Sequence, residues 1–400
     1  MKEFFTVRCP YCFQPLRYNN AVFRRTDGPM ATDKYLEIYH HDRSNFAYEE
    51  NLFDYVDPGD PKYKGRKFLD KNGYIIELEN PSNSSGINLT QRLCPFCHND
   101  LLDNFGRVKT KYIAVIGVSA SGKTTFLSAV NNQLRENSKF TWMTMSAKAS
   151  KSLEGITEKY REASDKARVS TKDINGPFFY RLDYSGSQKP DPRTETDVVF
   201  FDVPGEYYAK SEKINRQLQD YLTYADGIIF IVNSAEKIER AEAIHNGSES
   251  EETVTVINIL EALYESKILK NRRESLKTAI VFNKIDKVED DFNLFGGEEW
   301  QPPTIEDAID FDEIEAYSYR IKEAMLGNGG TQTPLQKELS AYMRKTIDVF
   351  GEDCPVFATK LITEIYGGKY RFNSSGADTP FLWLLAKMGA FPVKQEKKKQ

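Results

Sequence analysis

Short apolar runs alternate with stretches of helical periodicity from residue 109 onwards, and this alternation restricts the fold more than any other feature of the chain. The apolar runs lie at 112–117, 177–184, 197–203, 227–232, 278–283 and 354–359. The stretches with helical spacing lie at 123–135, 208–224, 253–268, 312–326, 335–349 and 381–389. Strands that are apolar along most of their length are buried on both faces, which is typical of parallel sheets covered by helices. The pattern therefore predicts an α/β domain with a mostly parallel sheet.

Three stretches depart from this pattern. The polar connection at 185–196 has the composition of a hairpin, so we expect the 177–184 strand to be antiparallel to its neighbour. Two acidic insertions interrupt the domain near 236–256 and 290–350. We interpret both as solvated surface, and the alternative is a docking surface for a basic partner.

Residues 1–108 differ from the rest in being rich in Tyr, Phe, Asp and Asn. Turn-forming clusters lie at 56–65 and 80–86, and the alternation at 71–80 predicts short strands and hairpins. The segment holds 14 Lys and Arg against 15 Asp and Glu, so it is not a basic patch. We therefore predict two domains, a small β-rich one at 1–108 and the α/β domain at 109–400.

The composition of the whole chain is that of a globular protein, with 40% hydrophobic residues, 28% charged residues and a net charge of −5. This charge gives no indication of binding to nucleic acid or to an anionic membrane. No apolar run is long enough to span a bilayer, and the N-terminus lacks the apolar region of a secretory signal. We expect a cytoplasmic protein with no membrane span, and the oligomeric state is not predicted.

The segment GVSASGKTTF at 117–126 joins the first predicted strand of the α/β domain to its first predicted helix. Its two glycines allow the backbone to bend and approach a phosphate closely, and a helix N-terminus presents N–H groups to an anion. Lys123 is expected to reach the β- and γ-phosphates of a nucleotide, and the Thr124 hydroxyl to ligate Mg²⁺. The residues predicted to contact the nucleotide here are Gly117, Ser119, Ala120, Ser121, Gly122, Lys123, Thr124 and Thr125.

A second candidate loop follows the apolar run at 197–203. Asp202 lies at the end of this run, where its carboxylate is expected to face the Mg²⁺ on Thr124, usually through water. Gly205 comes three residues later, and its backbone N–H is expected to meet the γ-phosphate. The spacing DxxG is weak by itself, but its place after a strand strengthens the prediction.

The identity of the base follows from NKID at 283–286, which comes after the 278–283 strand. The carboxylate of Asp286 can accept two parallel hydrogen bonds, and guanine offers a matching pair in its N1–H and 2-amino groups. Adenine has neither donor there and would leave a buried acceptor unpaired. Lys284 is expected to cover the base plane, and Asn283 to tie this loop to the phosphate loop. We therefore predict GTP rather than ATP.

The motifs GxxxxGKT, DxxG and NKxD, in this order and each at a strand end, resemble the translation-factor and Ras-like class of P-loop GTPases over roughly residues 109–390. The resemblance implies a six-stranded sheet with one antiparallel strand, flanked by helices, and a switch driven by Mg·GTP and its hydrolysis to GDP. It also implies a fifth motif in which backbone N–H groups read the guanine O6. FATKL provides the looser match, with Ala358, Thr359 and Lys360.

The same resemblance implies a threonine in the first switch segment that completes the Mg²⁺ shell. Thr171 fits this position, and Ser170 is the alternative. Arg168 lies three residues ahead, at the offset of the internal arginine finger of heterotrimeric G-protein α subunits, which neutralises charge on the transferring phosphate. The alternative is a solvated arginine at a helix end.

Glu206 departs from the Ras-like pattern, because those enzymes place a glutamine after this glycine to orient the attacking water. Glutamate cannot donate to the γ-phosphate, but it can act as a general base if its pKa is raised. The alternative is an exposed switch residue. We predict slow hydrolysis without a partner. The predicted catalytic residues are Lys123, Thr171, Gly205, Glu206 and Arg168.

Four of the five cysteines form two CxxC pairs, Cys9 with Cys12 and Cys94 with Cys97, separated by 81 residues. In a reducing cytoplasm this spacing predicts a metal site rather than disulfides, with free thiols as the alternative. Four thiolates make a closed tetrahedral Zn²⁺ site, which is structural. The pairs resemble the halves of a zinc ribbon, here with a β-rich module inserted at 13–93. His98 is a less favoured alternative ligand.

A zinc ribbon fused to a GTPase resembles the bacterial double-GTPase group, predicted GTPases often found in conflict or defence systems. The resemblance implies a GTP-hydrolysing switch that signals to or assembles with protein partners, through the zinc module or the switch segments. One alternative, which Glu206 favours, is a GTP-binding assembly or structural module with negligible turnover. Another is a ribosome- or RNA-associated GTPase, which the balanced charge of residues 1–108 disfavours.

Overall fold

The structure is a computed structural model. It describes residues 7–24, 55–71, 73–80, 88–102, 105–136, 139–140, 143–144, 146–149, 151–162, 177–183, 195–202, 222–245, 255–288, 302–303, 305, 309–327, 332–365, 369–374 and 376–391. The chain divides into two compact units, with the main boundary after Thr110.

The first unit is built of short antiparallel strands. β1 (Val7–Arg8) pairs with β2 (Pro15–Leu16), and β5 (Lys67–Leu69) pairs with β6 (Ile75–Leu78). A three-stranded sheet has the order β4 (Tyr55–Val56), β3 (Val22–Arg24), β7 (Arg92–Leu93), and the 3₁₀ helix η1 covers Tyr18–Asn20. One hydrophobic cluster of this unit consists of Phe23, Val56, Leu78 and Leu89, with Tyr63 and Ile75 packed against them. Other apolar residues of the unit, such as Leu16, Leu93 and Phe105, are buried as well.

Arginine–aromatic contacts add to the packing of this unit. The guanidinium carbon of Arg92, a residue only 4% exposed, lies 3.7 Å from the centre of the Tyr18 ring. Its nitrogens donate to the backbone carbonyls of Ile75 and Tyr18. Arg107 lies 5.3 Å from the same ring and forms a 2.9 Å ion pair with Asp70. The buried guanidinium of Arg92 and the half-buried one of Arg107 are tolerated here because carbonyl oxygens, a carboxylate and ring faces replace their water.

The second unit contains most of a sheet with the order β11–β12–β13–β8–β14–β15–β16. Its strands are β8 (Lys109–Ile116), β11 (Ser146–Ala149), β12 (Phe178–Asp183), β13 (Glu195–Asp202), β14 (Gly227–Asn233), β15 (Lys277–Asn283) and β16 (Val356–Thr359). β8, β14, β15 and β16 are parallel to one another. The six predicted strands are all present, so the prediction of a mostly parallel α/β sheet is confirmed. β11, whose sequence SAKA has no apolar run, adds an antiparallel strand beside β12 that was not predicted.

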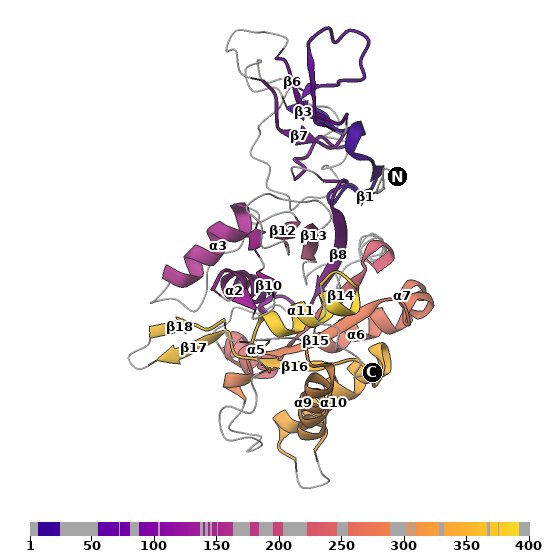
Figure 1. The fold of residues 1–400 in the computed structure, drawn as a ribbon. Coiled ribbons are helices and arrows are strands. Elements are labelled where there is room, and N and C mark those ends of the chain that lie inside the picture. The colour runs from indigo at the N-terminus through magenta and orange to yellow at the C-terminus, as the bar shows by residue number, and fades with distance from the viewer. Residues whose placement is uncertain are drawn as a thin grey trace, which may run out of the picture. The chain divides into compact units, whose positions relative to one another are not determined.

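Helices lie on the two sides of this sheet (Figure 1). They are α2 (Lys123–Glu136), α3 (Lys151–Glu162), α5 (Glu236–His245), α6 (Val256–Glu265), α7 (Lys267–Arg272), α9 (Phe311–Leu326), α10 (Pro334–Phe350) and α11 (Asp378–Lys387), with the 3₁₀ helix η3 (Ile285–Lys287). The helix predicted at 253–268 is divided at Ser266, whose hydroxyl accepts the Leu269 amide and begins α7. Neither α3 nor α5 was predicted, and the helix predicted at 208–224 is described only from residue 222.

Two short hairpins complete the unit, β9 (Lys139–Phe140) with β10 (Met143–Thr144) and β17 (Ile362–Ile365) with β18 (Lys369–Phe372). Neither hairpin was predicted, because strands of two to four residues show almost no periodicity in the sequence. Within the part of the chain that the structure describes, no helix is long and apolar enough to cross a membrane.

The insertion at 290–350 contributes α9 and α10, which lie side by side (Figure 1). Local signals set the start of α10: Thr333 and Gln336 form a capping box, and Pro334 occupies the first helical turn. α9 covers β16, the strand at the edge of the sheet. Tyr317 Oη accepts the Ala358 amide and Ser318 Oγ accepts the Val356 amide, each at 2.9 Å. Side chains of α9 therefore satisfy edge amides that a further strand would otherwise bond.

Candidate nucleotide-binding site and cysteine cluster

The loop between β8 and α2 is held in a tight curve that needs both of its glycines. Gly122 has φ of 88°, and a Cβ there would lie 2.3 Å from Asn283 Nδ2. A Cβ on Gly117 would lie 2.5 Å from the carbonyl oxygen of Ile231, a backbone atom that cannot move aside. Ala120 also has a positive φ, of 60°. The loop is therefore packed closely against the ends of β14 and β15, and only glycine fits at 117 and 122.

Lys123, the first residue of α2, places its positive charge inside this loop. Its Nζ donates to the carbonyl oxygens of Gly117 and Val118, each at 3.0 Å, and the residue is only 8% exposed. The ammonium therefore lies beside the N-terminus of α2, where backbone N–H groups and the helix dipole favour an anion. This combination is suited to binding a phosphate.

The other loop residues differ in exposure and partners. Ser119 and Ala120 are exposed, Thr124 is half-buried, and Ser121 is fully buried. The Oγ of Ser121 has no hydrogen-bond partner among the described residues, and its amide donates to Val118 O at 3.2 Å. Thr125 Oγ1 lies 2.9 Å from Tyr160 Oη, which links α2 to α3, the helix that precedes the predicted first switch segment.

Asn283 connects three of the predicted motifs. Its Nδ2 donates to the carbonyl oxygen of Ser121 at 3.0 Å, and its Oδ1 accepts from Thr359 Oγ1 at 3.1 Å. The side chain is buried, with 2% of the residue exposed. β15 and β16 are in parallel register with Asn283 opposite Thr359, so the ends of both strands reach the phosphate loop together. The phosphate loop, the NKID loop and the FATKL loop therefore meet at one side chain.

The turn that follows Asn283 is fixed by an acidic residue that the sequence analysis did not identify. Lys284 has φ of 62°, and its Nζ lies 2.7 and 2.6 Å from the two carboxylate oxygens of Glu239 on α5. Lys287 Nζ donates to the same carboxylate at 2.9 Å, and Asn233 Nδ2 donates to it at 3.0 Å. Asp286 lies in η3 between the two lysines and is half-buried.

Glu239 is ionised in this arrangement. Burial by itself would raise the pKa of its carboxyl, but the Lys284 ammonium and the hydrogen bonds from Lys284, Asn233 and Lys287 outweigh it. Together they lower the pKa of Glu239 from 4.5 to about 2. The loop predicted to bind the base is thus anchored by a carboxylate on α5 that is negatively charged at neutral pH.

FATKL, the segment predicted as the fifth motif, includes one residue whose backbone N–H has a partner within the protein. The Ala358 N–H donates to Tyr317 Oη, so this donor is already used by the inserted helix α9. Thr359 is opposite Asn283, and Lys360 follows the end of β16. In this arrangement the Ala358 N–H is therefore not available to a ligand.

Several predicted residues cannot be placed. Asp202 ends β13, as expected from the sequence, but its side chain is outside the described part. The structure also does not describe the switch and catalytic candidates Arg168, Ser170, Thr171, Gly205 and Glu206.

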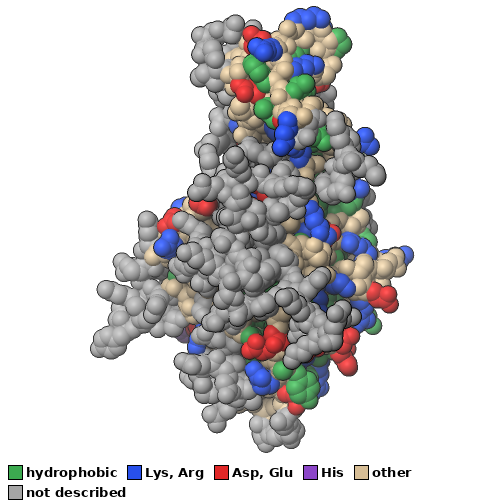
Figure 2. Space-filling model, in the orientation of Figure 1, with side chains coloured by type: hydrophobic (Ala, Val, Ile, Leu, Met, Phe, Trp, Pro, Cys, Tyr) green, Lys and Arg blue, Asp and Glu red, His purple; other side chains and the backbone are tan. Residues whose placement is uncertain are grey.

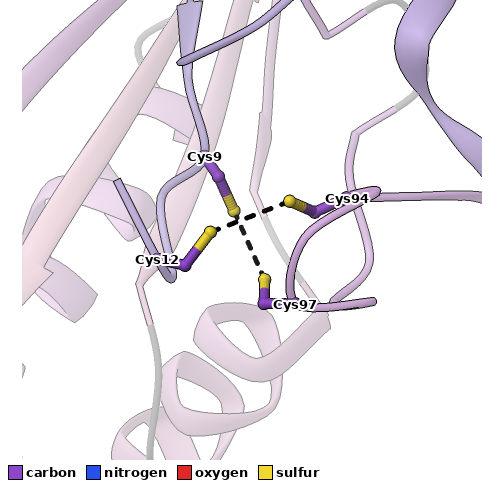
Figure 3. Close-up of side chains that lie close together, drawn as sticks. All are labelled: Cys9, Cys12, Cys94 and Cys97. Atoms are coloured by element: carbon purple, nitrogen blue, oxygen red, sulfur yellow. Dashed lines mark hydrogen bonds between the residues drawn. The ribbon is translucent and has the colours of Figure 1, made fainter. Parts of the chain in front are cut away.

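In the first unit the four paired cysteines converge, and Figure 3 shows their sulfur atoms turned toward one another. All four Sγ atoms lie within 4.8 Å of one another, with Cys9 and Cys97 3.6 Å apart and Cys12 and Cys94 3.8 Å apart. Zn–S bonds of about 2.3 Å in a regular tetrahedron place the sulfurs about 3.8 Å apart. The cluster therefore has the dimensions of a four-thiolate zinc site.

The two cysteine turns have the same local structure. In each turn the second cysteine is followed by a residue with positive φ, Phe13 at 59° and His98 at 53°, whose amide donates to the carbonyl of the first cysteine at 2.9 Å. Backbone amides of Tyr11 and Phe96 point at the first sulfur of each pair, at 3.4 Å. N–H groups directed at sulfur stabilise thiolates, which are the metal-binding form.

Buried thiols this close have strongly perturbed pKa values. Burial and hydrogen bonds with the other thiols raise the pKa of Cys9, whereas hydrogen bonds with the other three thiols lower the pKa of Cys12. His98, the alternative ligand, is buried with its ring centre 4.1 Å from that of Tyr55 and is not part of the cluster. Cys354 is buried and donates to Thr278 O at 3.1 Å, as suits a small core residue.

The fold and these loops define an α/β protein with the motif order of a GTPase. The Double-GTPase 2 family model matches residues 111–329, more than half of the chain, and the chain therefore belongs to the Double-GTPase 2 family. The predicted double-GTPase resemblance is thereby confirmed. The matched region includes the phosphate loop and NKID but ends before β16, and it does not include the cysteine cluster. A search of curated proteins finds no match to this chain.

Proposed function

We propose that the protein is a GTP-binding, Mg²⁺-dependent GTPase that acts as a molecular switch. The observation that carries this proposal is the junction at Asn283, which joins the phosphate loop to the two loops expected to hold the base. Membership of the Double-GTPase 2 family supports GTP as the nucleotide. The proposal assigns phosphate binding to the loop at 117–125 and guanine recognition to Asp286, with Lys284 over the base plane.

Hydrolysis requires a cation and residues around the γ-phosphate. The proposed Mg²⁺ ligands are Thr124, Thr171 and Asp202, and the ion when bound neutralises charge on the phosphates. Lys123 binds the β- and γ-phosphates from inside the loop. Gly205, Glu206 and Arg168 complete the proposed catalytic set, with Glu206 in the place of a water-orienting glutamine. Because glutamate adds negative charge beside the phosphate, turnover without a partner is slow.

The cysteine cluster is proposed to bind one Zn²⁺ as a structural ion. Its four thiols leave no open position for chemistry, and the strands around it are short. We propose that this unit, or the switch segments, contacts a protein partner, in a bacterial defence or conflict system. On the face drawn in Figure 2, positive and negative side chains are interspersed among the described residues, which does not favour a phosphate backbone as the partner.

Phosphate release from GTP and Mg²⁺ under multiple turnover tests the enzymatic proposal. Wild-type protein is expected to release phosphate slowly, and Lys123→Ala to abolish release, because the variant loses the buried cation of the phosphate loop. Lys159→Ala, on the exposed surface of α3, is the matched control and should behave as wild type. Release that persists in Lys123→Ala would contradict the proposal. GTP binding with no release at any protein concentration would favour an assembly module.

A further inference from the structure

Four hydrogen bonds from three side chains converge on the carboxylate of Glu239. Lys284 approaches both oxygens, at 2.7 and 2.6 Å, Lys287 approaches one at 2.9 Å, and Asn233 approaches the other at 3.0 Å. The Glu239 side chain is 15% exposed and that of Lys284 22%, so this ion pair is largely shielded from solvent, whereas the Lys287 side chain is 44% exposed. Charge-assisted hydrogen bonds of this kind are among the strongest polar contacts in proteins.

Glu239 is itself held by a well-anchored helix. Its amide donates to Ala235 O at 2.9 Å in the first turn of α5. Glu236, one turn earlier, accepts the Val256 amide at 3.3 Å and the Tyr342 hydroxyl at 2.6 Å. These contacts fix the start of α5 to α6 and to the inserted helix α10. The helix that carries Glu239 is therefore held in place, and its carboxylate has a fixed position next to the turn that it contacts.

The turn it contacts is the one that carries Asp286. Lys284 and Lys287 are its two ends, and the Lys287 amide donates to Lys284 O at 3.1 Å to close it. Lys284 has φ of 62°, a left-handed conformation that residues with a side chain seldom adopt without support. Because one carboxylate holds both ends, the backbone of Ile285 and Asp286 between them is constrained as well.

We infer that Glu239 is a positioning residue for guanine recognition, which holds Lys284 in its left-handed conformation and so sets the direction of the Asp286 carboxylate. This inference rests on the proposed binding of guanine nucleotides. No motif of the sequence contains Glu239, which lies 45 residues from Lys284 along the chain. Its contribution to affinity acts through the loop and not through contact with the nucleotide.

The inference predicts a change in base selectivity, which a merely structural role would not produce. GDP offers Asp286 both N1–H and the 2-amino group, whereas IDP lacks the 2-amino group. Loss of the anchor lets the carboxylate turn away from the 2-amino group, so Glu239→Ala should weaken GDP binding by about tenfold, the effect of one lost charged hydrogen bond. IDP binding should weaken less, so the preference for GDP over IDP falls.

Dissociation constants for GDP and IDP measured by calorimetry on the full chain provide the test. Glu239→Ala and the isosteric Glu239→Gln are compared with Glu242→Gln, a substitution on the exposed side of the same helix. We expect the GDP-to-IDP preference to fall in both Glu239 variants and to stay at the wild-type value in Glu242→Gln. Circular dichroism of each variant reports whether the fold is retained, and Glu239→Gln is the variant expected to keep it.

An unchanged preference for GDP over IDP in folded Glu239→Gln and Glu239→Ala would overturn the inference, whether the two affinities stay the same or fall by equal factors. In either case the wild-type protein still binds GDP, and the proposed function stands. A wild-type protein that binds neither nucleotide overturns the proposed function and the inference with it.

Discussion

Replacing Gly122 with alanine should destabilise the second unit by displacing Asn283. At φ of 88° an alanine costs about 1–2 kcal/mol in backbone strain. Its Cβ would also lie 2.3 Å from Asn283 Nδ2, so the amide must move away and lose its 3.0 Å bond to Ser121 O. Breaking this buried bond costs about 1–3 kcal/mol. Together the two effects lower the free energy of unfolding by about 2–5 kcal/mol.

A matched glycine separates these two effects. Gly389, just after α11, has φ of 63°, and a Cβ added there would have no atom within 4 Å, so Gly389→Ala carries the backbone strain alone. Its expected cost is about 1–2 kcal/mol. Asn283→Ala removes the group with which the new methyl collides. The double variant Gly122→Ala with Asn283→Ala should therefore be more stable than the sum of the single effects predicts, by about 1–3 kcal/mol.

Urea unfolding followed by circular dichroism gives the free energies of unfolding of the wild type and the four variants. The reasoning is refuted if Gly122→Ala costs no more than Gly389→Ala, or if the Gly122 and Asn283 substitutions are additive. Either result would mean that Asn283 does not form its hydrogen bond to the phosphate loop. The three loops would then not be joined through this side chain. Nucleotide is omitted from these measurements, so that the outcome reports on the protein contacts alone.

Three further predictions concern other parts of the molecule. Tyr317→Phe leaves a buried β16 amide without its acceptor and should cost about 1–3 kcal/mol in urea unfolding, whereas Tyr319→Phe, at a residue 63% exposed, should be neutral. Metal analysis should find one Zn²⁺ per chain in wild type and in Cys354→Ala but none in Cys12→Ser, and equal zinc in all three would contradict the cluster. The pKa of Glu239 is lowered from 4.5 to about 2 in the folded protein, so its ionised carboxylate contributes up to about 3 kcal/mol to the free energy of unfolding above pH 4.5. This contribution is lost as pH falls toward 2. Glu239→Gln should therefore show a shallower loss of stability between pH 4.5 and 2.

The sheet was predictable because its central strands are buried on both faces. Every residue of β14 is buried, and Ile228 to Val232 form a continuous apolar run, which a sequence shows directly. The added strand β11 pairs only with β12 at the edge of the sheet and has no such run. Helix α5 was interpreted as part of an acidic insertion, since its charged residues resemble those of a solvated loop.

The residues of the candidate site also differ in whether the sequence could predict them. Lys123, Asn283 and the cysteine pairs were predicted because their chemistry depends on spacing within a few residues of the chain. Glu239 and Tyr317 were missed, since each acts on a loop that is distant in sequence and close only after folding. One acidic residue in a charged helix and one tyrosine in an amphipathic helix carry no local signal of such a role. Only the tertiary structure identifies them.

Calorimetric titration with GDP and ADP measures whether the carboxylate of Asp286 recognises guanine, on which the proposed function depends. The account predicts tight binding of GDP and weak or undetectable binding of ADP by the wild-type protein. It also predicts that Asp286→Asn loses GDP and gains XDP, since an amide can donate to the 2-oxo group of xanthine and a carboxylate cannot. Equal affinity for GDP and ADP, or a nucleotide preference unchanged in Asp286→Asn, would contradict it.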